Sequence, residues 1–191
     1  MTATWEEFTW IPDEYPWTPG GVSFTFVRHD DAETVLDAMT TSTTGTVTGL
    51  EGVNADVEVV GVVQVGDWVL AVAPSVAGLS DEVMAPLSVG GEVLTFATQV
   101  GHSNFAQWVD GARTAMFDAA LKDGPGFDAP DSPWRDRMRE VGADPDSEGP
   151  MSDGRYHTLE IHLAMIVSHT GVELARELLR SGQFQVGDSL E

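Results

Sequence analysis

Short apolar runs joined by tight turns constrain the fold of this chain more than any other feature. Two pairs of strand-like segments are each separated by a short turn that contains glycine: Val57–Gln64 with Trp68–Ala73, and Asn104–Val109 with Ala112–Phe117. Gly66-Asp67 and Asp110-Gly111 at these turns are typical of β-hairpins, whose strands pair antiparallel. The pattern predicts a single α+β domain over residues 1–191. Its antiparallel sheet should have about five or six strands, with helices packed on one face.

Other strands and helices are predicted by periodicity and capping signals. Gly21–Arg28 alternates apolar and polar side chains, which predicts a half-buried strand, and Glu92–Thr98 predicts another. Helices are expected at Ala32–Met39, Ser80–Leu87, 133–141, 156–170 and Leu174–Arg180. Asp30 and Glu33 have the spacing of a capping box before the first of these helices. The polar run 40–46 is interpreted as a loop, and the tail 183–191 has no clear assignment.

The first 18 residues are rich in aromatic side chains. Thr4 and Glu7 have capping-box spacing, so a short helix should follow and end before Pro12. The aromatic residues of this segment are Trp5, Phe8, Trp10, Tyr15 and Trp17. Large aromatic side chains dominate the energetics of protein cores. We therefore expect this helix and loop to pack on the domain, in preference to forming an adhesive arm for a partner.

The charge of the chain is strongly negative and unevenly distributed. The 191 residues include 31 acids and 9 Lys or Arg, for a formal net charge of −22 at pH 7. Residues 29–112 contain no Lys or Arg, although acids recur throughout this stretch. Nucleic-acid binding rests on cations that neutralise phosphates, so direct binding of nucleic acid is disfavoured. One interpretation is that the acids form a surface that binds a basic partner. The other is that they keep the protein soluble and reflect a host that has a GC-rich genome or is adapted to salt.

Two further observations bear on the location of the protein. The chain has no cysteine, which excludes disulfides, thiolate zinc sites and cysteine nucleophiles. Its first residues are acidic and lack the positive and apolar regions of a secretory signal. No stretch reaches the ~18 apolar residues that a membrane span requires. We expect a cytoplasmic location and no contact with a membrane.

No motif in the sequence specifies a reaction. His162 and His169 share one face of a predicted helix, and His157 and Glu160 share another, but there is no HExxH motif. A serine triad would lack the GxSxG elbow, and no glycine-rich phosphate loop is present. Carboxylates paired at predicted helix starts are explained as caps. The acidic run 144–148 lacks the loop length and the glycine of an EF-hand. We predict no catalytic residue, no metal site and no cofactor.

Six segments occur in order over most of the chain: TWEEFTW, SFTFVRHDDAETVL, DWVLAVAP, EVMAPLSVGGEVLTF, FAQWVDGARTAMFD and SHTGVELARELL. As an ordered set they resemble a family of actinobacterial proteins of unknown function. The resemblance implies a compact α+β domain in an actinobacterium or one of its phages, and it implies no activity. In that family the strand beginning at Trp68 often carries a glutamate near its end. This chain has Ala71–Pro74 there instead.

Three functions are compatible with these observations. The leading hypothesis is a non-catalytic acidic interaction domain of the inhibitor, immunity or anti-defence type, with an unidentified protein partner that has a basic surface. The second is a small-ligand-binding or sensing domain with a pocket between sheet and helices. The third is a hydrolase that uses histidine and carboxylates. The residues predicted to take part in binding are Asp30, Asp31, Glu33, Trp68, Trp108 and Asp110.

Overall fold

The structure, a computed structural model, describes residues 3–29 and 31–190. Its strands are β1 (Gly21–Val27), β2 (Thr40–Thr48), β3 (Val59–Val65), β4 (Trp68–Ala73), β5 (Glu92–Gln99), β6 (His102–Val109), β7 (Ala112–Asp118) and β8 (Gln183–Ser189). They form one sheet in the order β2-β8-β3-β4-β1-β5-β6-β7, and neighbouring strands pair antiparallel. The predicted antiparallel α+β fold is confirmed. The sheet has eight strands within the described residues, in place of the five or six expected.

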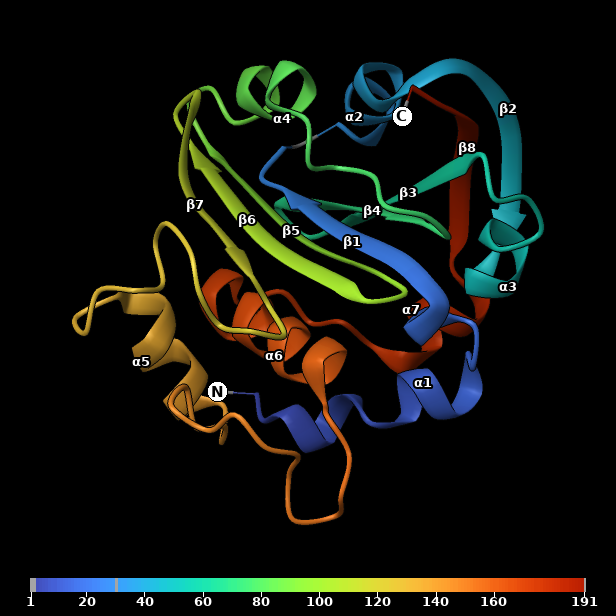
Figure 1. Ribbon diagram of the computed structural model, residues 1–191. Helices are drawn as coiled ribbons and strands as arrows, with labels where there is room; N and C mark the ends of the chain where they lie inside the picture. Colours follow the sequence, from blue (N-terminus) through green and yellow to red (C-terminus); the bar gives the residue numbers. More distant parts are fainter. Residues whose placement is uncertain (1–2, 30, 191) are drawn as a thin grey trace.

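The helices pack on both faces of this sheet. They are η1 (Trp5–Phe8), α1 (Trp10–Glu14), η2 (Thr18–Gly20), α2 (Ala32–Met39), α3 (Gly49–Val53), α4 (Asp81–Leu87), α5 (Pro133–Glu140), α6 (Thr158–Thr170) and α7 (Arg176–Ser181). Figure 1 shows α2 and α4 above the sheet and α1, α5, α6 and α7 below it. The prediction of helices on one face only was therefore wrong. No helix formed by residues 3–29 and 31–190 combines the length and the apolar character needed to cross a membrane.

Two apolar clusters explain why both faces are covered. In β4, Leu70 and Val72 belong to the apolar cluster between the sheet and α6, whereas Val69 and Ala71 belong to the cluster between the sheet and the helices α2 and α4. Successive side chains of a strand point to opposite faces, so a strand that is apolar throughout requires cover on both. β1 is buried on both faces as well, although its alternation predicted a half-buried strand.

Small polar side chains made β1 look half-exposed in the sequence. Ser23 and Thr25 are in fact buried, and the Thr25 hydroxyl lies 3.0 Å from the hydroxyl of Thr95 on the neighbouring strand β5. Buried polar groups are tolerated where they find a hydrogen-bond partner. A serine or threonine in an alternating pattern therefore does not show that the strand faces solvent.

The largest corrections concern β2 and β8. The run predicted as a polar loop is the edge strand β2, whose side chains are mostly exposed. The tail 183–191 contributes β8, which lies between β2 and β3 and buries Phe184 and Val186. These two segments are 135 residues or more apart in sequence where they pair, for example at Thr48 and Gln183. A local pattern cannot reveal such a pairing, because the partner supplies the stabilising contacts.

Most helix boundaries agree with the capping signals. The hydroxyl of Ser80 accepts a hydrogen bond from the Glu82 N–H at the start of α4, and Ser132 caps α5 in the same way through Trp134. α6 ends at Gly171, which has the left-handed conformation (φ 72°) that favours glycine at this position. These ends depend on neighbouring residues alone, and for that reason the sequence is sufficient to locate them.

One helix start differs from expectation, and the N-terminal segment contains one helix more than expected. The N-cap of α2 is Asp31, whose carboxylate accepts the Glu33 N–H, and the predicted cap Asp30 lies outside the described residues. The predicted N-terminal helix is confirmed: η1 starts after Thr4, whose N–H donates to the Glu7 carboxylate, and it ends at Phe8, before Pro12. A second short helix, α1, which the sequence did not predict, follows and continues to Glu14. Pro12 lies in the first turn of α1, where the backbone N–H has no partner within the helix and proline is tolerated.

The N-terminal segment packs on the domain, as its aromatic content predicts. η1 contacts α6, and Phe8, Ile11 and Tyr15 are buried. The hydroxyl of Tyr15 donates to the carbonyl of Leu179 in α7 at 3.1 Å. This segment therefore helps to position α6, the helix that carries the residues of the candidate site.

Candidate ligand-binding site

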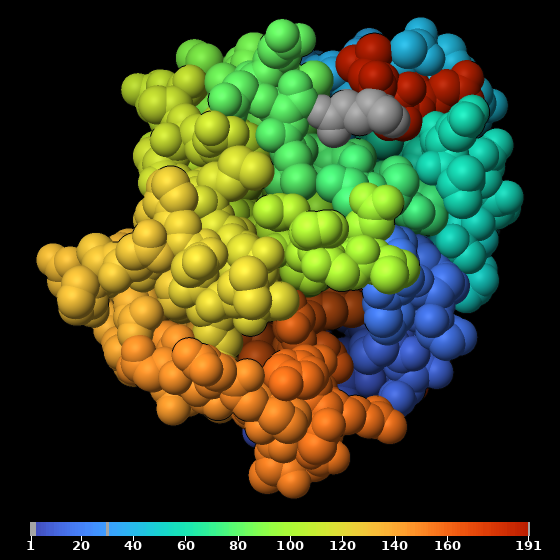
Figure 2. All heavy atoms as spheres, viewed as in Figure 1, coloured from blue at the N-terminus to red at the C-terminus, as the bar shows by residue number. Residues whose placement is uncertain are grey.

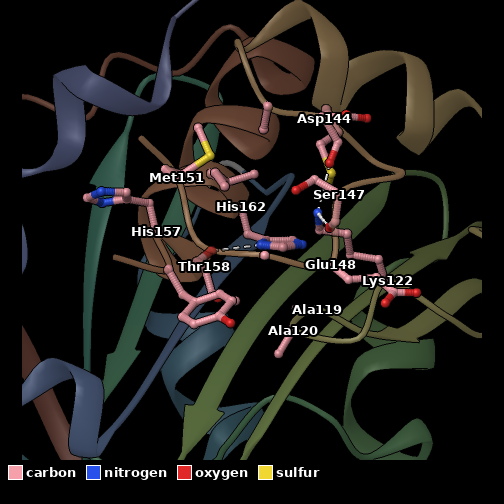
Figure 3. A pocket seen from close by; sticks show the side chains of 15 residues that line it. Ala119, Ala120, Lys122, Asp144, Ser147, Glu148, Met151, His157, Thr158 and His162 are labelled. Carbon is pink, nitrogen blue, oxygen red and sulfur yellow. Dashed lines mark hydrogen bonds between the residues drawn. The ribbon is translucent and has the colours of Figure 1, made fainter. Parts of the chain in front are cut away.

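A small cavity lies between α6, the segment after β7 and the loop of residues 143–157, here called the covering loop. Its volume is about 40 Å³, and Figure 3 shows the side chains that line it. The lining residues are Ala119, Ala120, Lys122, Met138, Ala143, Asp144, Ser147, Glu148, Gly149, Met151, Tyr156, His157, Thr158, Ile161 and His162. One water molecule takes up roughly 30 Å³ in the liquid, so the cavity has room for one small polar group.

His162 on α6 presents a hydrogen-bond acceptor to this cavity. Its Nδ1 lies 2.7 Å from the Thr158 carbonyl oxygen, which can only accept, so Nδ1 carries the proton. Burial lowers the pKa of His162 to about 4, and the nearby charge of Lys122 contributes in the same direction. The ring is therefore neutral at pH 7, with a lone pair on Nε2. This Nε2 is buried and has no hydrogen-bond partner among the described residues.

An aromatic cluster holds the His162 ring in place. The ring stacks on Phe96 with 5.3 Å between centroids, and it also contacts Phe105 and Phe117 at 5.9 and 6.0 Å. These rings come from β5, β6 and β7, so three adjacent strands form one wall around the histidine. Figure 3 shows Nε2 on the side of the ring opposite Thr158, toward Lys122. The acceptor is therefore fixed in direction.

Lys122, the only lysine of the chain, closes the cavity from the other side. Its Nζ donates to the carbonyl oxygens of Asp144 and Ser147, at 2.8 and 2.6 Å. An ammonium group has three N–H donors, so one N–H remains beyond these two bonds. Burial lowers the pKa of Lys122, which Asp144 and Asp146 partly offset. Lys122 thereby ties the covering loop to the segment that follows β7.

His157 fixes the other end of the covering loop. Its Nδ1 and Nε2 lie 2.8 Å from the carboxylates of Glu160 and Asp153 respectively, and the Trp5 ring packs on it at 4.3 Å. Burial disfavours the charged imidazolium, but the hydrogen bonds to Glu160 and Asp153 outweigh it and raise the pKa of His157. Both ring nitrogens donate only when the ring is protonated. His157 therefore acts as a charged clamp at the mouth of the cavity.

A larger groove adjoins the cavity. It has a volume of about 460 Å³ and shares three lining residues with the cavity: Tyr156, His157 and Thr158. Pro12 and Pro19 line its opposite side. Figure 2 shows the surface hollowed where the N-terminal segment, the β5–β6 turn and the start of α6 meet. A ligand that reached His162 would have space for a longer portion here.

The acidic residues predicted to bind lie away from this cavity, around α2 and α4. Asp31 and Glu33 are at the start of α2, where Asp31 also accepts the Thr34 hydroxyl at 2.6 Å. That hydrogen bond and the backbone N–H of Glu33 lower the pKa of Asp31. Asp110 occupies the β6–β7 turn with φ 48° and accepts the Gly90 N–H at 3.0 Å. Each of these two aspartates thus has a structural role, and Asp30 lies outside the described residues.

Trp68 and Trp108, both predicted to take part in binding, lie on opposite faces of the sheet and do not meet. Trp68 belongs to the apolar cluster between the sheet and α6, and Trp108 belongs to the cluster between the sheet and the helices α2 and α4. The indole N–H of Trp108 donates to the carboxylate of Asp81 at 2.8 Å. Trp68 borders a separate open groove beside Gly171 and Val172. The sheet separates the two rings, so no single ligand contacts both.

The other candidate histidine of α6 is also separate from the cavity. His169 Nε2 lies 2.9 Å from a carboxylate oxygen of Glu92, and its ring packs on Trp134 at 5.1 Å. His162 and His169 therefore do not form one site. Within residues 3–29 and 31–190, no group of three or more His, Asp or Glu side chains is placed to hold a metal ion.

Sequence reasoning singled out His162 but missed Lys122 as its neighbour. The two residues are 40 positions apart, and Lys122 lies in a loop rich in Gly, Pro and Asp. One signal was present: a single lysine in a chain with eight arginines is unusual enough to ask what it contacts. Lysine suits this position because its slender ammonium reaches two backbone carbonyls, whereas the planar guanidinium of arginine is bulkier.

The fold and the cavity define an α+β protein with one central antiparallel sheet and a small buried site at the edge of its α6 layer. The chain belongs to a family of unknown function, DUF6461, whose sequence model matches residues 1–189. No curated protein and no solved structure matches the chain.

Proposed function

We propose that this protein is a small-ligand-binding domain and that its binding site is the cavity at His162. One observation carries the proposal: the Nε2 of a buried, neutral histidine faces the cavity without a hydrogen-bond partner among the described residues. Leaving a buried polar atom unpaired costs about 1–3 kcal/mol, so native structures rarely keep such an atom without a partner. A ligand group in the cavity supplies the missing hydrogen bond. The sequence offered this function as its second hypothesis.

The same geometry favours binding over the hydrolase hypothesis. A general base works best when its pKa lies near the working pH, whereas His162 has a pKa of about 4. Its Nδ1 bonds to a backbone carbonyl, and no carboxylate of residues 3–29 and 31–190 orients the ring as in a catalytic triad. These properties suit a fixed acceptor that recognises a ligand without taking its proton.

A ligand screen with a matched pair of variants tests the proposal. The wild-type protein, His162→Phe and His169→Phe are heated with a library of small polar metabolites, and the melting temperatures are compared. His162→Phe keeps a ring among Phe96, Phe105 and Phe117 but removes Nε2. A ligand present at 100 times its Kd stabilises the folded state by about 2.7 kcal/mol. We expect compounds that stabilise the wild type and His169→Phe but not His162→Phe; a library without any such compound contradicts the proposal.

An acidic interaction domain, the leading hypothesis from the sequence, is our second candidate. The helices α2 and α4 contact each other and cover one face of the sheet, and neither contains Lys or Arg. On the opposite layer the arginines are engaged locally, for example Arg137 with Glu140 at 2.6 Å and Arg180 with Glu14 at 2.8 Å. The α2–α4 layer presents Glu33, Asp37, Asp81 and Glu82, of which Asp81 pairs with Arg113 at 3.3 Å. Such a surface would speed association with a basic protein.

Charge reversals separate this candidate from simple solubility. Asp37→Lys and Glu82→Lys change the exposed side of α2 and α4, and Glu177→Lys on α7 serves as the control. A specific basic partner captured by the wild type should be lost with the first pair and retained with the control. Loss with all three variants would indicate attraction to net charge alone and would reject an α2–α4 binding surface. The inhibitor, immunity or anti-defence role and the actinobacterial host are part of this second proposal.

A further inference from the structure

The polar atoms around the cavity narrow the class of ligand, an inference that rests on the proposed function. His162 offers a lone pair at Nε2, and Lys122 has one N–H beyond its two bonds to Asp144 and Ser147. We infer that the cavity binds a neutral group that both donates and accepts a hydrogen bond, namely a hydroxyl or a primary amide. Its donor bonds to His162 Nε2, and its acceptor takes the remaining N–H of Lys122. A volume of about 40 Å³ suits a group of this size.

Anionic groups do not match this arrangement. An ionised carboxylate, or the dianion of a phosphate monoester, has only acceptor oxygens, and one of them would face the Nε2 lone pair of His162. Protonating the imidazole to receive an anion would cost free energy near pH 7, because burial among three phenylalanine rings lowers its pKa to about 4. The ring also stays in one tautomer, because the Thr158 carbonyl holds the proton on Nδ1. Glu148 on the cavity wall adds repulsion for an anion.

Cationic groups fail for the opposite reason. An ammonium group could donate to His162 Nε2, but it has no acceptor to offer Lys122 and carries the same charge. An ammonium ligand at the carbonyl oxygens of Asp144 and Ser147 would lie beside the Lys122 ammonium that already donates to both, and the two like charges would repel. Only a group with both a donor and an acceptor can form hydrogen bonds with both His162 Nε2 and Lys122.

The adjoining groove sets where the rest of the ligand lies. Tyr156 lines both hollows and its side chain is exposed, so a chain or ring attached to the bound group would leave the cavity beside Tyr156. Pro12 and Pro19 give the far side of the groove an apolar surface. The ligand expected here has a small neutral polar head and a larger, weakly polar body.

Four small probes distinguish the classes of head group. Acetamide and ethanol carry the proposed chemistry, whereas acetate and methylammonium are an anion and a cation of similar size. Each is titrated into the full-length protein labelled with ¹⁵N, and the imidazole nitrogens of His162 are followed by NMR. We expect acetamide, ethanol or both to shift the Nε2 resonance saturably, without change at His169. If both probes shift the resonance, the cavity accepts any neutral group that donates and accepts a hydrogen bond. If only one does, the head group is an amide or a hydroxyl accordingly.

Variants at the two walls complete the test. Because each head-group bond is buried, Lys122→Met should weaken binding of the responding probe roughly tenfold, as measured at the His162 resonance. Binding to His162→Phe, followed through the backbone amides of Thr158 and Ile161, should weaken by a similar factor. His169→Phe should leave the affinity within about twofold. Melting temperatures of the apo variants establish that each is folded.

Two outcomes would overturn the inference. If acetate or methylammonium binds at His162 at least as tightly as acetamide and ethanol, the ligand class is wrong, although the cavity remains a binding site. If none of the four probes shifts Nε2, the assigned head group is also wrong. In that case the library screen with His162→Phe decides separately whether the proposed function survives, because it does not assume any ligand class.

Discussion

At the scale of single residues, the histidines of α6 show how position along one helix sets chemical character. His157, His162 and His169 are on or beside the same helix, yet one is clamped between two carboxylates, one is neutral in an aromatic cluster and one pairs with Glu92. Their neighbours create these differences: Glu160 and Asp153 for His157, the rings of β5 to β7 for His162, and Glu92 of β5 for His169.

The clamp at His157 predicts a pH-dependent stability. The folded-state pKa of His157 is raised, so its contribution is fully present below the unfolded pKa of about 6.5 and is lost as pH rises through the folded value. We expect His157→Gln to lose about 1–3 kcal/mol of unfolding free energy at pH 6 and less at pH 9. Urea denaturation across this range measures the difference. The exposed His102→Gln should track the wild type, and a loss that does not change with pH would contradict the clamp.

At the scale of elements, the junction between β2 and α3 depends on one close backbone contact. Gly49 has φ 63°, and its N–H donates to the carbonyl of Gly182 at 2.8 Å. A Cβ on Gly49 would lie 2.2 Å from the carbonyl oxygen of Arg180 in α7. Glycine is therefore needed here for two reasons: its φ is positive, and the backbone of α7 lies too close to leave room for a Cβ. This close approach joins the N-terminal half of the chain to α7.

Alanine substitutions separate these two requirements. Gly90 has a similar φ of 72°, but a Cβ on it would meet no atom within 4 Å, so Gly90→Ala should cost only the left-handed conformation, about 1–2 kcal/mol. Gly49→Ala should cost clearly more, because α7 must also move. Chemical denaturation of both variants compares the two costs. Equal losses would show that the contact between Gly49 and Arg180 has no energetic weight.

At the scale of the whole molecule, β8 holds the β2 edge and the rest of the sheet together. Deleting residues 183–189 would leave β2 without a sheet partner, leave β3 paired with β4 alone, and remove the buried side chains of Phe184 and Val186. Each such side chain contributes roughly 1.5–3 kcal/mol against a total stability of about 5–15 kcal/mol. We expect a chain ending at Gly182 to be unfolded by circular dichroism. A chain ending at Ser189 should stay folded, and native-like melting of the shorter chain would contradict this role of β8.

Net charge makes a second prediction at this scale. A formal charge of −22 repels itself in the compact state, and salt screens that repulsion over a Debye length of about 10 Å at 0.1 M. We expect the melting temperature to rise between low salt and about 0.5 M NaCl. This rise should exceed the rise in sucrose at equal concentration, which stabilises by exclusion from the protein surface but does not screen charge. A melting temperature that falls with salt would mean that the ion pairs of α5 and α7 outweigh the general repulsion.

Features that depend on neighbouring residues could be predicted from the sequence. Both hairpins, the caps of α4 and α5 and the end of α6 at Gly171 follow from turn and capping chemistry within a few positions. Half of the candidate site was foreseeable in the same way, since His162 was recognised as a histidine on a helix. Its partner Lys122 was not, because nothing local links the two residues.

Both hairpins, most helix ends and the negative charge of residues 29–112 follow from the order of residues alone. Three features emerge only in the folded chain: β8 completes the sheet, both faces of the sheet are buried, and the covering loop leaves His162 Nε2 facing a cavity. The physical reason is the range of the interactions. Turns and caps form between residues a few positions apart, whereas sheet pairing, burial and the tie from Lys122 to Asp144 and Ser147 require distant segments to meet.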